Sequence, residues 1–124
     1  MSPRVALITG ASSGIGKALA IEAVKRGYSV GLMARSEESL SETASLCSKF
    51  IKTTTFDQPQ KVFMFIGDVG IEEHCRKFIH ESLLQFDRID VLINNAGISM
   101  RGIFLDTALS VLQRLMDTNF WGTV

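Results

Sequence analysis

Three glycines in one short segment are placed where a protein backbone could hold an anion. The segment, Thr9-Gly10-Ala11-Ser12-Ser13-Gly14-Ile15-Gly16, joins a short apolar run to a stretch with helical periodicity. At such a junction the backbone N–H groups and the positive end of the helix dipole can face a pyrophosphate. Gly10 allows the tight turn, Gly14 lets the phosphate approach the backbone, and Gly16 lets the helix approach the strand. An ordinary turn is the alternative, because a glycine pattern alone is weakly diagnostic.

The residues after the second apolar run bear on which nucleotide would bind. A carboxylate there would accept hydrogen bonds from the 2′-hydroxyl of an adenosine ribose, but the sequence reads Met33-Ala34-Arg35-Ser36. Arg35 could instead pair with a 2′-phosphate, and Ser36 could donate a hydrogen bond to it. This pattern favours NADP(H) over NAD(H). The alternative is that Arg35 is a solvated residue at the end of a strand.

Polar residues also follow the third and fourth apolar runs. Asp68, in Gly67-Asp68-Val69, could accept a hydrogen bond from the amino group of adenine, or it could equally cap the next helix. Asn94-Asn95-Ala96-Gly97 ends the fourth run, where two amides could fix the edge of a sheet and let a cofactor pass close to the backbone. A turn made only for structural reasons is the alternative for this second motif.

Asn119 places an amide on an apolar helical stripe. Its spacing from Leu112, Leu115 and Met116 puts it among side chains expected to be buried, and a buried amide needs partners. Asn119 is either a core asparagine whose amide makes its hydrogen bonds within the protein, or a group that holds a water or relays a proton near an active site.

The cysteines and histidines carry weaker signals. Cys47 and Cys75 lie on apolar helix faces and are expected in the core. They lack metal-ligand spacing, so no metal site is expected. His74 and His80 lie off the apolar stripe of their helix, on a face that is expected to be solvated, and neither is expected to be catalytic.

The elements that position these residues alternate in a βαβ order. Strands are expected over residues 5–9, 29–34, 62–66 and 91–94. Helices are expected over about 15–26, after Ser36, over about 72–86 and from about 106. Ser36, followed by Glu37 and Glu38, is the expected N-cap of the second helix. Because the strands are almost uniformly apolar, they suit a parallel sheet covered by helices on both faces. The expected fold class is α/β, a doubly wound parallel sheet of the Rossmann type, truncated after the fourth strand and its following helix. Residues 1–124 would form a single dinucleotide-binding domain, incomplete at its C-terminal end.

The composition excludes several classes of partner. The chain has 124 residues, with 13 Lys plus Arg against 13 Asp plus Glu, so its formal net charge is zero. A neutral chain has no long-range field to attract nucleic acid or an anionic membrane. No apolar run is long enough for a transmembrane segment, and the pattern contains neither a signal peptide nor a disulfide framework. We therefore expect a cytoplasmic protein.

Taken in order, the glycine segment, Asp68, the Asn94-Asn95-Ala96-Gly97 motif and Asn119 resemble the short-chain dehydrogenase/reductase family. The resemblance implies cofactor contacts at Gly10, Ser12, Ser13, Gly14, Ile15, Gly16, Arg35, Asp68, Val69, Asn95, Ala96 and Gly97. It also implies that Asn119 is the asparagine of the family's Asn-Ser-Tyr-Lys tetrad. The stretch Ala34-Arg35-Ser36 looks like that of NADP(H)-preferring members, including steroid-type and sphingoid-base-type reductases.

The sequence departs from the family in its catalytic group. The family's serine and its Tyr-x-x-x-Lys pair are absent, and the single tyrosine, Tyr28, precedes the second strand. In the family that tyrosine is the general acid/base, and the serine polarises the carbonyl. The resemblance thus implies the N-terminal part of an NADP(H)-dependent carbonyl reductase or alcohol dehydrogenase, inactive as a fragment. Its complete form would be homo-oligomeric and would act on a ketone, an aldehyde or a secondary alcohol.

Two alternatives to this interpretation come from other functional classes. The first is a non-catalytic nucleotide-binding or interaction module. The second is a methyltransferase that binds S-adenosylmethionine, which shares the fold but leaves the Asn94-Asn95-Ala96-Gly97 motif unexplained.

Overall fold

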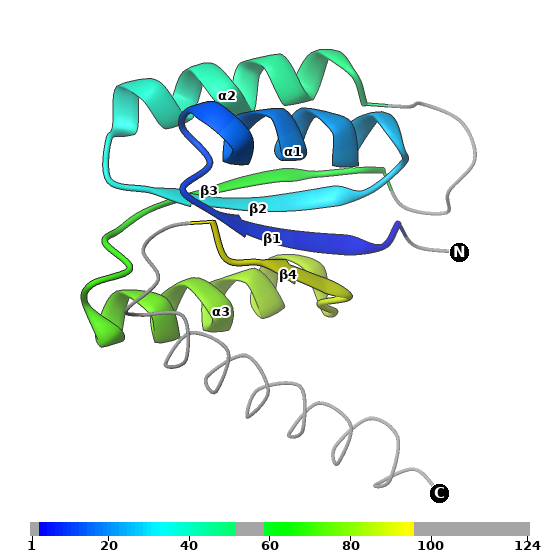
Figure 1. The fold of residues 1–124 in the computed structure, drawn as a ribbon. Coiled ribbons are helices and arrows are strands. Elements are labelled where there is room, and N and C mark those ends of the chain that lie inside the picture. The colour runs from blue at the N-terminus through cyan, green and yellow to red at the C-terminus, as the bar shows by residue number, and fades with distance from the viewer. Residues whose placement is uncertain (1–2, 52–58, 96–124) are drawn as a thin grey trace, which may run out of the picture.

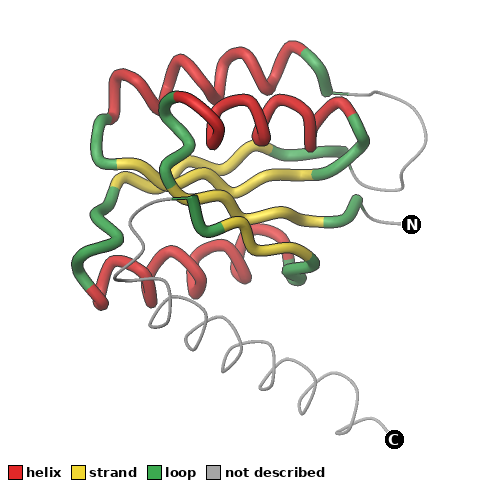
Figure 2. The backbone as a smooth tube through the Cα atoms, in the orientation of Figure 1, coloured by secondary structure: helices red, strands yellow, loops and turns green. Residues whose placement is uncertain are grey.

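The computed structural model describes residues 3–51 and 59–95, which form a four-stranded sheet between two layers of helix. In chain order the elements are β1 (Val5–Thr9), α1 (Gly14–Lys25), β2 (Ser29–Ala34), α2 (Glu37–Lys49), β3 (Val62–Ile66), α3 (Glu72–Phe86) and β4 (Val91–Ile93). The strands are all parallel and lie in the order β3-β2-β1-β4. Helices α1 and α2 cover one face of the sheet and α3 covers the other (Figures 1 and 2). The predicted α/β parallel sheet is thereby confirmed.

Most predicted boundaries agree with the structure. β1, β2, β3 and α3 have the predicted bounds, whereas α1 begins and ends one residue earlier than predicted. β4 ends at Ile93, one residue before the predicted end. The helix predicted from about residue 106 lies outside the described residues. Within those residues, none of the helices is long and apolar enough to cross a membrane.

Two apolar layers explain why the central strands are buried throughout. In β1, Val5 and Leu7 pack toward α3, while Ala6 and Ile8 pack toward α1 and α2. Every residue of β1 and of β2 is buried, as expected for strands with helices on both faces. The two layers therefore fix β1 rigidly, and β1 leads directly into the glycine segment.

Both cysteines are buried in these layers, as predicted. Cys47 lies in the layer under α1 and α2, and Cys75 lies in the layer under α3. Burial raises the pKa of the Cys47 thiol to about 11, so this side chain is a neutral, unreactive core residue at physiological pH.

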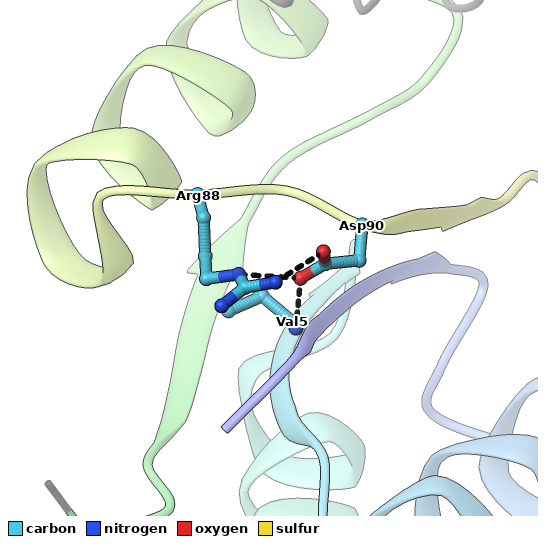
Figure 3. Close-up of polar contacts among 3 residues, drawn as sticks. All are labelled: Val5, Arg88 and Asp90. Atoms are coloured by element: carbon cyan, nitrogen blue, oxygen red, sulfur yellow. Dashed lines mark hydrogen bonds and ion pairs between the residues drawn. The ribbon is translucent and has the colours of Figure 1, made fainter. Parts of the chain in front are cut away.

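Asp90 joins the first residues of β1 and β4. Its carboxylate accepts hydrogen bonds from the Arg88 guanidinium at 2.8 and 2.7 Å and from the Val5 N–H at 2.8 Å (Figure 3). The Asp90 N–H in turn donates to the Val5 carbonyl at 2.9 Å. These bonds set the register in which Ala6 lies opposite Val91. That register brings the far end of β4 alongside the end of β1.

The charge of Asp90 is stabilised by the fold. Burial by itself would raise the pKa of this carboxyl group. The hydrogen bonds from Arg88 and from the Val5 N–H, together with the positive charges of Arg88 and Arg4, outweigh burial and hold the pKa below its ordinary value of 3.8. Because the pKa is lower in the folded state, the carboxylate stabilises the fold at neutral pH, and this contribution is lost as the pH falls below 3.8.

Asp90→Asn should lower the free energy of unfolding by about 1 kcal/mol at pH 7, a modest value because the Arg88 side chain is 39% exposed. Urea unfolding of both proteins at pH 7 and at about pH 3 measures this, and the difference between them should shrink at the lower pH. Glu22→Gln, which breaks a more exposed ion pair with Arg26, is the control and should have a smaller effect at pH 7. If the two proteins differed as much in unfolding free energy at about pH 3 as at pH 7, the stabilising role of the Asp90 charge would be contradicted.

Candidate functional site

Thr9 connects the ends of β1 and β4 at the carboxyl edge of the sheet. Its fully buried side chain donates from Oγ1 to Asn94 Oδ1 at 3.1 Å and accepts from the Asn95 N–H at 3.0 Å. The predicted role of the two asparagines in fixing the strand edge therefore has a specific partner. Sequence reasoning gave Thr9 no role of its own. The available signal was a polar side chain in the last position of an otherwise apolar strand.

The glycine segment meets the β4 end at Gly16. The Asn95 side chain donates from Nδ2 to the Gly10 carbonyl at 3.4 Å. A Cβ atom on Gly16 would lie 2.1 Å from that carbonyl oxygen and 2.8 Å from Asn95 Nδ2. A side chain cannot be accommodated at either distance, so glycine is required here for α1 to approach the strand ends, as predicted.

The first turn of α1 is open to an anion. Its N-cap residue, Ser13, makes no side-chain capping hydrogen bond, and the turn carries no acidic residue. By contrast, α2 and α3 begin with the acidic pairs Glu37-Glu38 and Glu72-Glu73. The positive end of the α1 dipole is therefore not neutralised by its own side chains.

Gly14, the first residue of α1, adds space at this turn. It has a left-handed φ of 58° and is exposed, and a Cβ atom placed on it would meet no heavy atom within 4 Å. Ile15 beside it is 69% exposed. The backbone is thus accessible at the point where the sequence predicts a phosphate, and the observed space fits such a group.

The end of β2 lies beside the glycine segment. The Ala11 N–H donates to the Met33 carbonyl at 3.3 Å, which ties the loop to the strand. Arg35, the next residue after the strand, is exposed. Ser36 caps α2, because its Oγ accepts from the Ser39 N–H at 3.3 Å. This confirms the capping role predicted for Ser36 and leaves the Arg35 side chain in solvent at the same edge of the sheet.

Asp68 closes a turn after β3 and does not cap α3. Its Oδ1 accepts from the Gly70 N–H at 2.8 Å, and its carbonyl accepts from the Ile71 N–H at 2.9 Å. The N-cap of α3 is Ile71. The helix-capping alternative for Asp68 is therefore wrong, since the turn inserts two residues between Asp68 and the N-cap.

Two side chains of α3 hold the segment that follows β3. His74 Nδ1 accepts from the Asp68 N–H at 2.9 Å, and Cys75 Sγ donates to the Val69 carbonyl at 3.5 Å. Burial raises the pKa of the Cys75 thiol, and the charges of Asp68 and Glu72 raise it further, which keeps the donor proton on sulfur.

The expectation of a solvated His74 is wrong. This side chain is partly buried, because it reaches back over the turn instead of pointing along the exposed face of α3. The available signal was its position: the third residue of a helix can bond to the backbone before the helix. His80, on the same helix, is exposed as expected.

The described part of the predicted site lies along one edge of the sheet. The glycine segment, Arg35, Asp68 and the two asparagines each follow the carboxyl end of a parallel strand. Ala96, Gly97 and Asn119 lie outside the described residues. Within those residues, no group of three or more His, Cys, Asp or Glu side chains could hold a metal ion.

Comparison with known proteins agrees with this arrangement. A family model described as short chain dehydrogenase matches residues 4–124. The chain belongs to the short-chain dehydrogenase family. The resemblance inferred from the glycine segment, Asp68, the asparagine motif and Asn119 is therefore confirmed.

Named relatives of this short-chain dehydrogenase chain are longer than it is. It is 39% identical over 122 residues to 11-beta-hydroxysteroid dehydrogenase-like 4A of Arabidopsis thaliana, which covers 98% of the chain and 38% of the relative. The crystal structure of L-sorbose reductase from Gluconobacter frateurii, complexed with NADPH and L-sorbose, is 37% identical with a TM-score of 0.66, over 78% of this chain and 34% of that one. An NADH-dependent reductase complexed with NAD is 30% identical with a TM-score of 0.63, over 77% and 37% of the two chains. Structural neighbours in this family thus include both NADP-type and NAD-type proteins.

Gly16→Ala should destabilise this short-chain dehydrogenase fold by about 3 kcal/mol or more, because the new methyl group would overlap the Gly10 carbonyl. Gly14→Ala is the matched substitution, and it should cost only about 1 kcal/mol of left-handed backbone strain because its Cβ enters open space. Urea unfolding monitored by circular dichroism compares the two. Equal losses of unfolding free energy in the two variants would show that the close contact at Gly16 is no more costly than the backbone strain at Gly14.

Proposed function

We propose that this chain forms the nucleotide-binding part of an NADP(H)-dependent oxidoreductase. In the complete protein, the nicotinamide supplies or accepts a hydride, and the substrate is a ketone, an aldehyde or a secondary alcohol. The observation that carries the proposal is the open first turn of α1 at the carboxyl edge of the sheet, the edge at which Arg35, Asp68 and Asn95 also lie. An exposed, uncapped helix N-terminus is suited to hold a pyrophosphate.

The residues of the glycine segment would hold the pyrophosphate. The first backbone N–H groups of an α-helix have no partner within the helix, and Gly14 leaves open space beside those of α1. We propose contacts from Gly10, Ser12, Ser13, Gly14, Ile15 and Gly16. Asn95 supports the same loop through its bond to the Gly10 carbonyl. Ala96 and Gly97, which follow it in the sequence, are proposed as further cofactor contacts.

The proposed preference for NADP(H) rests on the end of β2. Ala34 provides no carboxylate to accept from a ribose 2′-hydroxyl, and the exposed Arg35 guanidinium is free to pair with a 2′-phosphate. Ser36 would donate to the same phosphate from its hydroxyl group. Asp68 and Val69, one strand further along, would meet the adenine.

The proposed substrate class is defined by the reacting carbon and not by a molecular skeleton. One relative is named for a hydroxysteroid dehydrogenase and a structural neighbour for a sorbose reductase. A steroid and a sugar share a carbinol or carbonyl carbon but no common skeleton. We propose that Asn119 acts at that carbon indirectly, by holding a water or a backbone group of the proton relay.

Arg35→Ala in the complete protein should weaken NADPH binding by about 1.5 to 3 kcal/mol, or about 10- to 150-fold, because a charge-assisted pair is lost. NADH binding should be nearly unchanged, since NADH lacks the 2′-phosphate. Fluorescence titration of both nucleotides measures this, with Arg26→Ala at the other end of α1 as the control. Equal losses of affinity for the two nucleotides would show that Arg35 does not bind the 2′-phosphate.

Asn119→Ala in the complete enzyme should lower kcat by about 10² to 10⁴, the usual contribution of a positioned proton-transfer group, with little change in Tm. Steady-state kinetics and thermal melting together decide between the two roles. Full turnover with a lower Tm would show that Asn119 is a core asparagine.

A further inference from the structure

The segment after β3 is bordered by two glycines. Asp68 and Val69 lie between Gly67 and Gly70, and glycine permits backbone rotations that other residues do not. Within the segment, one oxygen of the Asp68 carboxylate is held by the Gly70 N–H. The orientation of this turn, and with it the direction of the second oxygen, depends on how its main chain is anchored to other elements.

The structure provides anchors on both sides. From the sheet, the Ala34 carbonyl accepts from the Gly67 N–H at 3.0 Å. From α3, Cys75 Sγ donates to the Val69 carbonyl, and His74 Nδ1 accepts from the Asp68 N–H at 2.9 Å. Among the described contacts, the bond to His74 is the one that fixes the Asp68 main chain to a side chain of another element.

This bond assigns a role to one ring nitrogen of the imidazole. A backbone N–H can only donate, so His74 Nδ1 is the acceptor. The N–H group and the Cβ atom of Asp68 are both attached to its Cα. Holding the N–H therefore fixes the orientation of the peptide group between Gly67 and Asp68. This in turn restricts the direction in which the carboxylate points.

We propose that His74 is a positioning residue for adenine recognition. By holding the Asp68 N–H, it directs the Asp68 carboxylate so that one oxygen accepts from Gly70 and the other can accept from the 6-amino group of adenine. This inference rests on the proposed function, because it assumes that Asp68 meets the adenine. It adds a residue that touches no part of the nucleotide but controls discrimination at the base.

The test compares NADPH with its hypoxanthine analogue, which carries an oxygen in place of the 6-amino group. Both are titrated by fluorescence into the complete protein. The wild type should bind NADPH about 10- to 150-fold more tightly than the analogue, the range expected for one hydrogen bond to a charged group. The ratio of the two affinities is the readout, because general loss of folded protein lowers both affinities equally.

The variants are matched in shape. His74→Asn keeps an acceptor, since Oδ1 occupies nearly the position of Nδ1, whereas His74→Leu has a similar outline and no acceptor. The asparagine variant should retain most of the wild-type ratio, and the leucine variant should bring it close to one. His80→Leu, at an exposed position of the same helix, is the control and should keep the full ratio. Urea midpoints confirm that each variant is folded.

The outcomes separate this inference from the function on which it rests. A wild type that binds neither nucleotide overturns the proposed function and this inference with it. A wild type that binds both equally leaves nucleotide binding intact and overturns adenine recognition through Asp68. A leucine variant that keeps the full ratio, or an asparagine variant that loses it, overturns the role of His74 alone.

Discussion

The pairing of β4 with β1 is the constraint on which the candidate site depends. It joins backbone groups 85 positions apart in the chain and is fixed at both ends by side chains. Asp90 holds the beginning of the pair through the Val5 N–H, and Thr9 holds its end through Asn94 and the Asn95 N–H. A shift of one residue would turn every β4 side chain to the opposite face of the sheet. The asparagines meet the glycine segment because that shift is prevented.

The N-termini of the three helices in the described part of the chain differ in how they are stabilised. α2 and α3 place acidic pairs in their first turns, which stabilises each helix through its own dipole. The first turn of α1 lacks both an acidic residue and a side-chain cap, so this helix is stabilised by packing on its buried face. Ala20 and Val24 on that face are fully buried. Stability thus comes from the core, and the terminus stays available to a ligand.

Periodicity was sufficient to predict the elements but not all of their side-chain partners. The apolar runs of β1, β2 and β3 and the stripe of α3 predicted the bounds of these elements correctly. Burial followed for the central strands β1 and β2, whereas β3, at the edge of the sheet, is only partly buried. The Ser36 cap was also predictable, since both partners lie within one turn. The roles of Thr9 and His74 were missed. Each bonds to a segment whose position depends on a loop, and a sequence pattern does not specify loop geometry.

The long separation between β1 and β4 also has a kinetic consequence. β1 and β2 are joined by one short crossover, so their pairing closes a small loop, whereas the Thr9–Asn94 contact must close a loop of 85 residues. Loop-closure entropy rises by only about 0.6 kcal/mol for each doubling of length, but non-local pairings slow the search for the native topology. We therefore expect β4 to join the sheet after β1, α1 and β2 have formed. In that order the glycine segment takes shape first, and the folding step that adds Asn95 is the one that completes the ligand-facing edge.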